Sequence, residues 1–169
     1  MTAAVPSSPL SASEFRHAVG RFATGVTVVG TVDDDVRYGM TVNSFTSVSL
    51  DPLLVLFCCE RDSSLHEPIL RSAVWGVSVL GAEQQEDAAW FAKRGLAGED
   101  QFADRETTRG AVTGSPLLTH ALAWFECRTW ASYDGGDHTI LVGEVVDLAV
   151  ADEDRPLLYF RSQYKTTAD

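Results

Sequence analysis

The side chains best suited to hold a ligand gather between residues 39 and 64. Hydroxyl and amide groups crowd the first half of this stretch, at Thr41, Asn43, Ser44, Thr46, Ser47 and Ser49. Such groups can bind a ligand or close local backbone hydrogen bonds. Residues 53–59 follow as a continuous apolar run, which predicts a buried strand. The stretch therefore predicts either a ligand site built on the core or an edge strand with a Ser/Thr-rich turn.

A second group of ligand-type side chains begins where the apolar run ends. Ser63 and Ser64 precede a segment that predicts a short helix, and Ser64 and Glu67 have the spacing of a capping box. Free backbone N–H groups at a helix start, with two hydroxyls beside Arg61, could hold a phosphate. Pro68 prefers the first helical position, so Glu67 is an alternative cap. Either way the two serines lie near the start of a helix.

Two further helices are predicted around these groups. The first begins with a capping box of Ser11 and Glu14 and ends at Gly25. Its apolar residues share one face and are Phe15, Val19 and Phe22. The second covers residues 83–94, is acidic in its first turn and basic in its last, and is closed by Gly95. Its aromatic residues, Trp90 and Phe91, are expected to anchor it in the core.

Most of the remaining elements are predicted as strands. The strand-like runs are residues 26–32, 36–42, 53–59, 74–80, 121–133, 139–150 and 157–160. Gly135 and Gly136 predict a hairpin turn between the two longest runs. Residues 33–35 are three aspartates, which favour a solvated hairpin turn over a cation site because adjacent carboxylates rarely converge. Residues 161–164 are expected to form a polar tail.

The strand at residues 121–133 has no cleanly polar face. One side carries Trp124, Glu126, Arg128 and Trp130, and the other carries Phe125, Cys127 and Thr129. We expect this strand to be buried on both sides, by a barrel interior and by a partner surface, so the sequence predicts a homodimer.

The predicted architecture is mainly β, with many hairpin-connected strands and few peripheral helices. This pattern indicates a closed or nearly closed β-barrel. No Gly-x-Gly-x-x-Gly follows a strand, which argues against a Rossmann nucleotide site. The chain has 169 residues, which suits one domain. We place that domain at residues 12–165, after a flexible tail at residues 1–11 that lacks the features of a secretion signal.

The composition and charge of the chain limit the classes of partner and metal ligand that it can bind. The net charge of −11 and the pI near 4.6 argue against nucleic acid and anionic membranes as partners. No apolar run reaches the length of a membrane span. The three cysteines, Cys58, Cys59 and Cys127, are too few for a disulfide framework or a spaced zinc site, and they fit a reducing cytoplasm. The four histidines show no metal-binding spacing, so no metal is predicted.

Three blocks of the chain resemble one known family. They are residues 22–29 (FATGVTVV), 41–52 (TVNSFTSVSLDP) and 136–139 (GDHT). Together they resemble the flavin-reductase-like, FMN-binding split-barrel family over about residues 15 to 164, and three blocks in the same order are specific where one would not be. Members are small reductase components of two-component flavin-dependent monooxygenases. The resemblance implies a dimeric, six-stranded split β-barrel that binds flavin near the interface.

The resemblance also implies flavin contacts from three parts of the chain. The residues expected at the ribityl chain and ring edge are Thr41, Asn43 and Ser44. The residues expected along the isoalloxazine ring are Ser47, Val48 and Ser49. The residues expected along the path of the ribityl phosphate are Cys58, Ser63 and Ser64. The flavin is FMN or FAD, which the sequence does not distinguish.

The same resemblance implies a nicotinamide site. His138 is expected to face the nicotinamide of NADH or NADPH, as the catalytic residue and a cofactor contact, with Tyr164 closing the same side. From the residues alone, the plain alternatives are an exposed hairpin residue for His138 and simple packing for Tyr164.

Residues 96–115 form a charged stretch with no clear period, and a loop of this length is usually functional or disordered. Family members use such a segment to close an aromatic residue, preceded by a basic one, over the flavin. Phe102 is the matching aromatic here, whereas Gln101 stands at the basic position. Arg105 and Arg109 are nearby alternatives for the charge, and a solvent-exposed excursion is the plain alternative.

The implied activity is hydride transfer from NADH or NADPH to flavin N5, with reduced flavin released to a partner monooxygenase. Because the cofactors perform the redox chemistry, the protein must mainly hold donor carbon and acceptor nitrogen about 3 to 3.5 Å apart. No nucleophile or acid/base pair is required. Two other classes stay open: a flavin-retaining oxidase or electron-transfer protein on the same barrel, and a non-catalytic module that binds flavin or another nucleotide.

Overall fold

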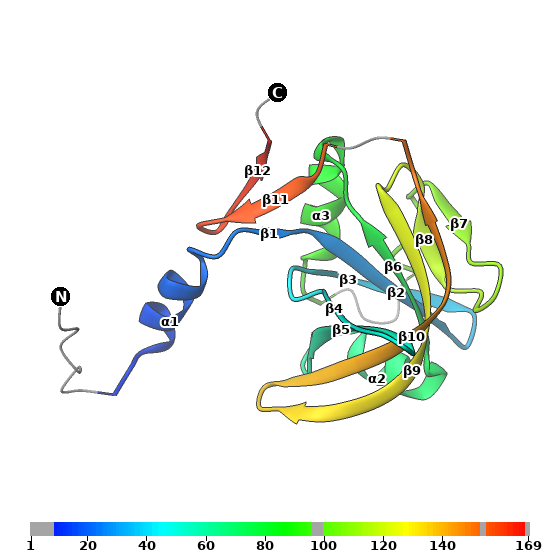
Figure 1. Ribbon diagram of the computed structural model, residues 1–169, viewed down its shortest axis with the longest axis horizontal. Coiled ribbons are helices and arrows are strands. Elements are labelled where there is room, and N and C mark those ends of the chain that lie inside the picture. The colour runs from blue at the N-terminus through cyan, green and yellow to red at the C-terminus, as the bar shows by residue number, and fades with distance from the viewer. Residues whose placement is uncertain (1–8, 96–99, 153–154, 168–169) are drawn as a thin grey trace.

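Antiparallel strands dominate the chain, whose computed structural model describes residues 9–95, 100–152 and 155–167 (Figure 1). The main sheet runs in the order β3 (Val36–Val42), β2 (Thr27–Asp33), β6 (Val74–Val79), β9 (Ala123–Gly135), β10 (His138–Val150), β5 (Leu53–Glu60) and β4 (Thr46–Leu50). The mainly β architecture with few peripheral helices is confirmed. The sheet differs from the six-stranded expectation because it has seven strands, and its pairing order is open, with β3 and β4 at the two edges.

Two hairpins form where the turn residues predict them. Between β2 and β3, Asp34 and Asp35 both adopt the left-handed conformation, with φ of 48° and 65°, as a two-residue hairpin turn requires. The Asp33 carboxylate forms an ion pair of 2.5 Å with the Arg71 guanidinium. Between β9 and β10, His138 pairs with Gly135, so the turn is built on Gly136 and Asp137. The described residues contain no cluster of three or more His, Cys, Asp or Glu side chains that could hold a metal.

Strand β5 is buried on one face only, so the apolar run is less completely buried than the sequence predicts. Val55, Phe57 and Cys59 lie in the core, whereas the residues between them are half-buried. This alternation is that of a sheet with one face on the core. Phe57 packs edge to face on Trp75, with ring centroids 5.2 Å apart, at the centre of this core cluster.

Strand β9 is covered on its outer face by the chain itself. The segment between α3 and β9 carries β7 (Thr107–Arg109) and β8 (Pro116–Leu118) and lies over Glu126. Glu126 is only 3% exposed. Further along the strand, Trp130 is 56% exposed. Part of the burial that we assigned to a partner surface is therefore intramolecular. The segment between α3 and β9 also contains more structure than the unpatterned loop predicted for residues 96–115, of which residues 96–99 lie outside the described residues.

Helices α1 and α3 are shorter than predicted. Helix α1 (Ala12–Val19) has the capping box of Ser11 and Glu14 but ends at Gly20, not Gly25. Figure 1 shows it projecting from the sheet, and none of its residues is buried. Its apolar stripe therefore does not pack on the chain's own core. The predicted tail at residues 1–11 falls mostly outside the described residues.

Helix α2 (His66–Ser72) lacks the predicted capping box. Leu65 is its N-cap and makes no side-chain cap hydrogen bond. Helix α3 (Gln85–Phe91) follows a 3-10 turn at Ala82–Gln84 and ends before Lys93. Phe91 is buried as expected. No helix among the described residues is both long and apolar enough to span a membrane.

The C-terminal segment forms a hairpin in place of the expected polar tail. β11 (Leu157–Phe160) pairs with β12 (Gln163–Thr166) and with β1 (Thr24–Gly25) in a three-stranded sheet. The turn uses Arg161 and Ser162, with φ of 52° and 59°. This hairpin places Tyr164 directly opposite Tyr159.

Candidate functional site

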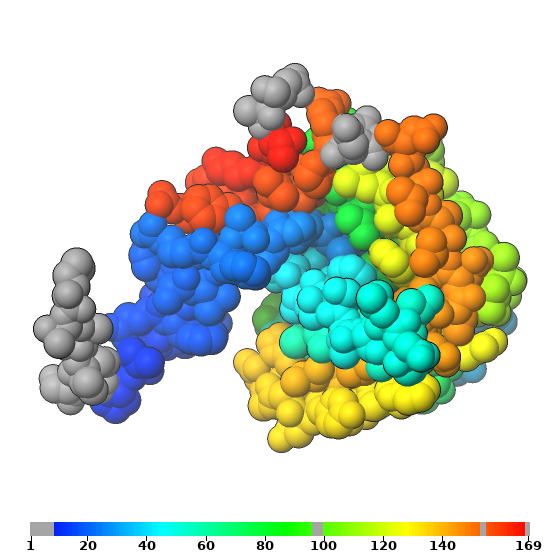
Figure 2. Space-filling view, viewed as in Figure 1, coloured from blue at the N-terminus to red at the C-terminus, as the bar shows by residue number. Residues whose placement is uncertain are grey.

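Three neighbouring hollows form one groove. The first, of about 710 Å³, lies between α1 and the β3–β4 loop and is lined by Asn43, Ser44 and Phe45 from that loop and by Thr46 at the start of β4. The second, of about 180 Å³, shares Asn43 and Tyr159 with the first. The third, of about 230 Å³, shares Thr41 and Ala92 with the second. Figure 2 shows the open space between the blue arm and the cyan segment on this face. We call the three hollows together the groove.

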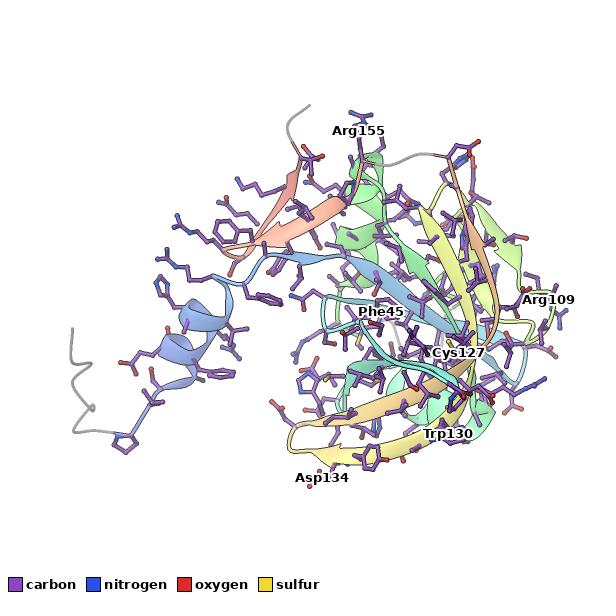
Figure 3. The ribbon with its side chains drawn as sticks, in the orientation of Figure 1. Phe45, Arg109, Cys127, Trp130, Asp134 and Arg155 are labelled. Carbon is purple, nitrogen blue, oxygen red and sulfur yellow. The ribbon has the colours of Figure 1, made fainter. Side chains whose placement is uncertain are left out.

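The first hollow is shaped by the loop between β3 and β4. The Ser44 hydroxyl accepts a hydrogen bond of 3.0 Å from the Cys58 backbone N–H, which ties this loop to β5. Phe45 points inward, beside Cys127 in Figure 3, and its ring lies 5.6 Å from that of Phe125. The inward Phe45 anchors the loop, so the polar side chains next to it face the hollow.

Aromatic side chains form one wall of the second hollow. The rings of Tyr159 and Tyr164 meet edge to face with centroids 5.6 Å apart. Burial raises the pKa of the Tyr164 phenol, and the Tyr159 phenol adds to the effect, so Tyr164 is neutral at physiological pH. Across from them, the Thr41 hydroxyl donates to the Ala88 carbonyl at 2.7 Å. This wall suits an aromatic ring system better than a charged group.

The third hollow is the polar end of the groove. Its lining includes Ser63, Ser64, Lys93 and Arg94, together with the carboxylate residues Glu60 and Asp62. The Lys93 ammonium lies 4.5 Å from the centre of the Trp90 ring, and Arg94 forms an ion pair with Glu60. Hydroxyl and cationic donors thus meet in one hollow of a chain whose net charge is −11. Such donors are what an anionic phosphate requires.

Lys93 and Arg94 were missed as site residues by sequence reasoning. Their position suggested only a basic last turn that complements a helix dipole. The helix ends before them, and the bend after it brings them to Ser63 and Ser64, about thirty residues earlier in the chain. A basic pair followed by Gly95, in a strongly acidic chain, was the available signal.

Arg61 does not join this polar end, contrary to the sequence-based prediction. Its guanidinium donates to the Asp134 carboxylate at 2.7 Å and to the Gly136 carbonyl at 3.0 Å. Asp134 lies at the far end of the β9–β10 hairpin in Figure 3. The Ser63 hydroxyl donates to the Glu60 carbonyl at 2.7 Å, which closes the turn after β5. Arg61 therefore braces the hairpin, while Ser63 and Ser64 stay at the groove.

Other predicted flavin contacts lie beside the groove. Cys58 is half-buried on β5, next to Ser44 through its backbone N–H. Ser47, Val48 and Ser49 lie on the edge strand β4 and line none of the three hollows. The β4–β5 register shifts between Ser47 and Ser49, which leaves Val48 as an exposed extra residue. Edge-strand β4 is thus available to a ligand or to another chain.

His138 lies next to the polar end. It pairs directly with Glu60 across the β5–β10 ladder, so the two side chains project on the same side of the sheet. Its Nδ1 lies 2.7 Å from the Asp137 carboxylate. This hydrogen bond, with the charge of His138, lowers the pKa of Asp137. His138 is partly exposed at the start of β10, beside Glu60 of the third hollow.

Phe102 lies beneath the groove and not over it. Its side chain is 1% exposed and its ring lies 4.6 Å from that of Phe91, in a buried apolar cluster that also contains Leu80 and Leu118. The two nearby arginines are engaged elsewhere: Arg105 stacks on Trp90 at 4.9 Å, and Arg109 lies on the side of the molecule away from α1 (Figure 3). In this conformation Phe102 supports the floor of the site from below.

The sequence model of the flavin reductase like domain matches residues 19–168. The chain therefore belongs to the flavin-reductase-like family. The reductase subunit of a flavin-dependent monooxygenase from Rhodococcus jostii is 41% identical over 161 residues, covering 95% of this chain and 80% of that protein. The NADH-dependent FMN reductase of Agrobacterium fabrum is 45% identical over 145 residues, covering 86% of this chain and 80% of that protein.

Solved structures of the flavin-reductase-like family have the same fold. The NADH:FAD oxidoreductase of Streptomyces globisporus, in complex with NAD and FAD fragments, superimposes with a TM-score of 0.89 at 37% identity, covering 98% of each chain. The groove is therefore a feature of a flavin-reductase-like domain, and the match covers its lining residues from Val19 onward.

Proposed function

We propose that this chain is an NAD(P)H:flavin oxidoreductase that reduces FMN or FAD and releases the reduced flavin to a partner monooxygenase. The observation that carries the proposal is the groove, which joins an aromatic wall at Tyr159 and Tyr164 to a phosphate-type end at Ser63, Ser64 and Lys93. A flavin nucleotide has the same two parts, a planar ring and an anionic phosphate. The relatives named for NADH and for FMN or FAD reduction support the same assignment.

The residues present fit a flavin. We assign the ring and ribityl chain to Thr41, Asn43 and Ser44, where the first and second hollows meet. The phosphate is assigned to Ser63, Ser64, Lys93 and Arg94. Ser47, Val48, Ser49 and Cys58 complete the predicted set from the neighbouring strands. Phe102 is assigned a supporting role beneath the ring site, since its own surface is buried.

The nicotinamide is assigned to the side of the groove that carries His138, with Tyr164 as the facing aromatic. When both are bound, reduced nicotinamide supplies a hydride to flavin N5. The chain's own contribution is to hold the two rings in contact and to exclude water between them. Neutral Tyr164 places no charge beside the rings. Hydride transfer between the two cofactors requires no acid/base pair from the protein.

The deciding experiment measures oxidation of NADH and NADPH by protein stripped of ligand, with and without FMN, FAD or riboflavin. The proposal predicts oxidation that saturates with added flavin, and the comparison would settle both cofactor preferences. Oxidation that needs no added flavin, by protein that retains its own, would point to an oxidase or electron-transfer protein. Flavin binding without any oxidation would reject the reductase and leave a binding module.

A homodimer is the assembly that we propose for this reductase. Phe22, next to α1, is 75% exposed, and Leu50, at the end of edge strand β4, is 88% exposed. Phe22 lines the first hollow, so a second copy that covers it would also complete a wall of the site. Sedimentation velocity should give a dimer for the wild type and a monomer for Leu50→Asp combined with Phe22→Asp. A wild-type monomer at all concentrations would exclude this assembly.

We place the protein in the cytoplasm. Cys58, Cys59 and Cys127 are free thiols, which suits a reducing compartment, and NAD(P)H is a cytoplasmic reductant.

We also propose that the curled seven-stranded sheet corresponds to the split barrel of the family.

A further inference from the structure

The side chain of Gln101 is buried between strand β3 and the polar end of the groove. Its residue is 3% exposed. The Gly39 backbone N–H donates to Gln101 Oε1 at 2.7 Å, and Gln101 Nε2 donates to the Ser64 hydroxyl oxygen at 2.8 Å. Because a backbone N–H can only donate, the first contact fixes which end of the amide is oxygen. The nitrogen end must then face Ser64.

The backbone of Gln101 is anchored as well. Its N–H donates to the Arg37 carbonyl at 3.1 Å, and its carbonyl accepts from the Trp90 indole at 2.9 Å. The next residue, Phe102, is locked in the core. The amide is therefore presented to Ser64 from a fixed position, with little freedom to rotate away.

This arrangement sets the role of the Ser64 hydroxyl. An amide NH₂ has no acceptor, so the Ser64 oxygen must accept in their contact and its own proton points elsewhere. Among the described residues, no protein group accepts that proton. Ser64 lines the third hollow together with Lys93 and Arg94. Its hydroxyl is thus held as a donor into a hollow that also carries Lys93 and Arg94, the latter paired with Glu60.

We propose that Gln101 is a positioning residue that holds the Ser64 hydroxyl as a hydrogen-bond donor toward a phosphate oxygen in the third hollow. The proposal rests on the proposed flavin reductase function. The phosphate comes either from the flavin or from the diphosphate of the nicotinamide nucleotide. The resemblance to the family implies a basic residue at the position of Gln101. A basic residue would attract the phosphate by its own charge, whereas the neutral Gln101 amide would act on the phosphate through the Ser64 hydroxyl.

The test compares dissociation constants of FMN and riboflavin, measured by flavin fluorescence titration, because riboflavin lacks the phosphate. Ser64→Ala should weaken FMN about tenfold, the loss of about one charge-assisted hydrogen bond, and leave riboflavin within about twofold. Gln101→Glu should weaken FMN binding at least as much as Ser64→Ala does. The new carboxylate would accept the Ser64 proton, so the lone pairs of the Ser64 oxygen, and not its proton, would face the hollow. Gln101→Met, which is neutral, should weaken FMN a few-fold with riboflavin unchanged.

The double variant separates positioning from simple charge repulsion. If Gln101 acts through Ser64, Gln101→Glu should cost FMN binding much less in the Ser64→Ala background than in the wild type. A loss of FMN affinity that is equally large in both backgrounds, or an equal loss of riboflavin affinity, would overturn the proposal. Gln84→Glu is the matched control, because Gln84 is also buried and its Oε1 accepts from the Gly81 N–H at 3.1 Å. It should leave the ratio of FMN to riboflavin affinity unchanged.

Calorimetric titration with NAD⁺ distinguishes the two sources of phosphate. Weakened NAD⁺ binding with unchanged FMN binding would support the donor role and assign the third hollow to the nicotinamide nucleotide. Unchanged affinity for both, in variants that fold, would reject the role of Gln101. That result would leave the reductase intact, provided that the wild type oxidises NADH with added flavin. Failure of the wild type to do so would instead reject the reductase.

Discussion

Tyr164 meets Tyr159 edge to face across the β11–β12 hairpin, with their ring centroids 5.6 Å apart, and both rings line the groove. The two residues lie directly opposite in the strand register, and the turn at Arg161 and Ser162 sets that register. A segment expected to be a tail thereby supplies a wall of the candidate site.

Removing the Tyr164 ring should weaken ligand binding more than it weakens the fold. Tyr164→Ala is expected to raise the flavin dissociation constant about 3- to 10-fold, because one aromatic wall of the second hollow is lost. Tyr164→Phe keeps the ring and should bind flavin as the wild type does. Fluorescence titration checks both variants, and an unchanged affinity of Tyr164→Ala would remove this wall from the flavin site.

Glu126 should contribute more stability at neutral pH than in acid. Burial alone would raise its pKa, but hydrogen bonds from the Thr113 hydroxyl and from the backbone N–H groups of Val112 and Thr113 outweigh burial and lower it. The stability from this lowered pKa is therefore present above the unfolded value, about 4.3, and is lost as pH falls through the folded pKa.

Glu126→Gln should accordingly lower the free energy of unfolding by about 2 kcal/mol at pH 7, and by less as the pH falls below about 4. Urea unfolding at several pH values measures the difference. Glu144→Gln on the adjoining strand is the control, since Glu144 accepts no hydrogen bond from the described residues. A Glu126→Gln cost that stays constant with pH would contradict the lowered pKa.

Gly39 should not tolerate even one added methyl group. A Cβ there would lie 2.7 Å from the Phe91 ring and 2.8 Å from the Phe102 ring, both in the packed core. Gly39→Ala is expected to lower the free energy of unfolding by about 1 to 3 kcal/mol. Gly25→Ala is the control, because no heavy atom lies within 4 Å of a Cβ at that position. Similar unfolding midpoints for the two variants would show that the core beneath β3 is loosely packed.

His138→Ala should affect the nicotinamide and spare the flavin. If His138 faces the nicotinamide, the apparent KM for NADH should rise about 3- to 10-fold while the flavin dissociation constant holds. His120→Ala is the control, since His120 is another exposed histidine paired with a carboxylate, that of Glu106 at 3.1 Å. Steady-state kinetics with varied NADH gives the answer, and a KM equal to that of the control would place His138 outside the site.

Elements whose residues carry local signals could be predicted from the sequence. The hairpin turns at Asp34 and Gly136 need left-handed backbone, which Asp and Gly supply, so their residue types predict them. The capping box of Ser11 and Glu14 is similarly local, because the two residues lie one helical turn apart.

The parts that could not be predicted depend on contacts between distant segments. Ser64 has capping-box spacing, yet its hydroxyl contacts Gln101, 37 residues later in the chain, and no periodicity reports that partner. Lys93 reaches the same hollow only because α3 ends early. The residues of the β3–β4 loop were identified through a resemblance to a family, since hydroxyl-rich turns are common.

The projecting helix α1 bears on how the chain folds. Eight residues are too few for a helix to persist alone in water, and α1 buries no side chain in its own chain. Its order must come largely from whatever covers its apolar face. If that cover is a second copy, the N-terminal segment becomes ordered only when two chains assemble. The helix content of the protein should then decrease as the protein is diluted.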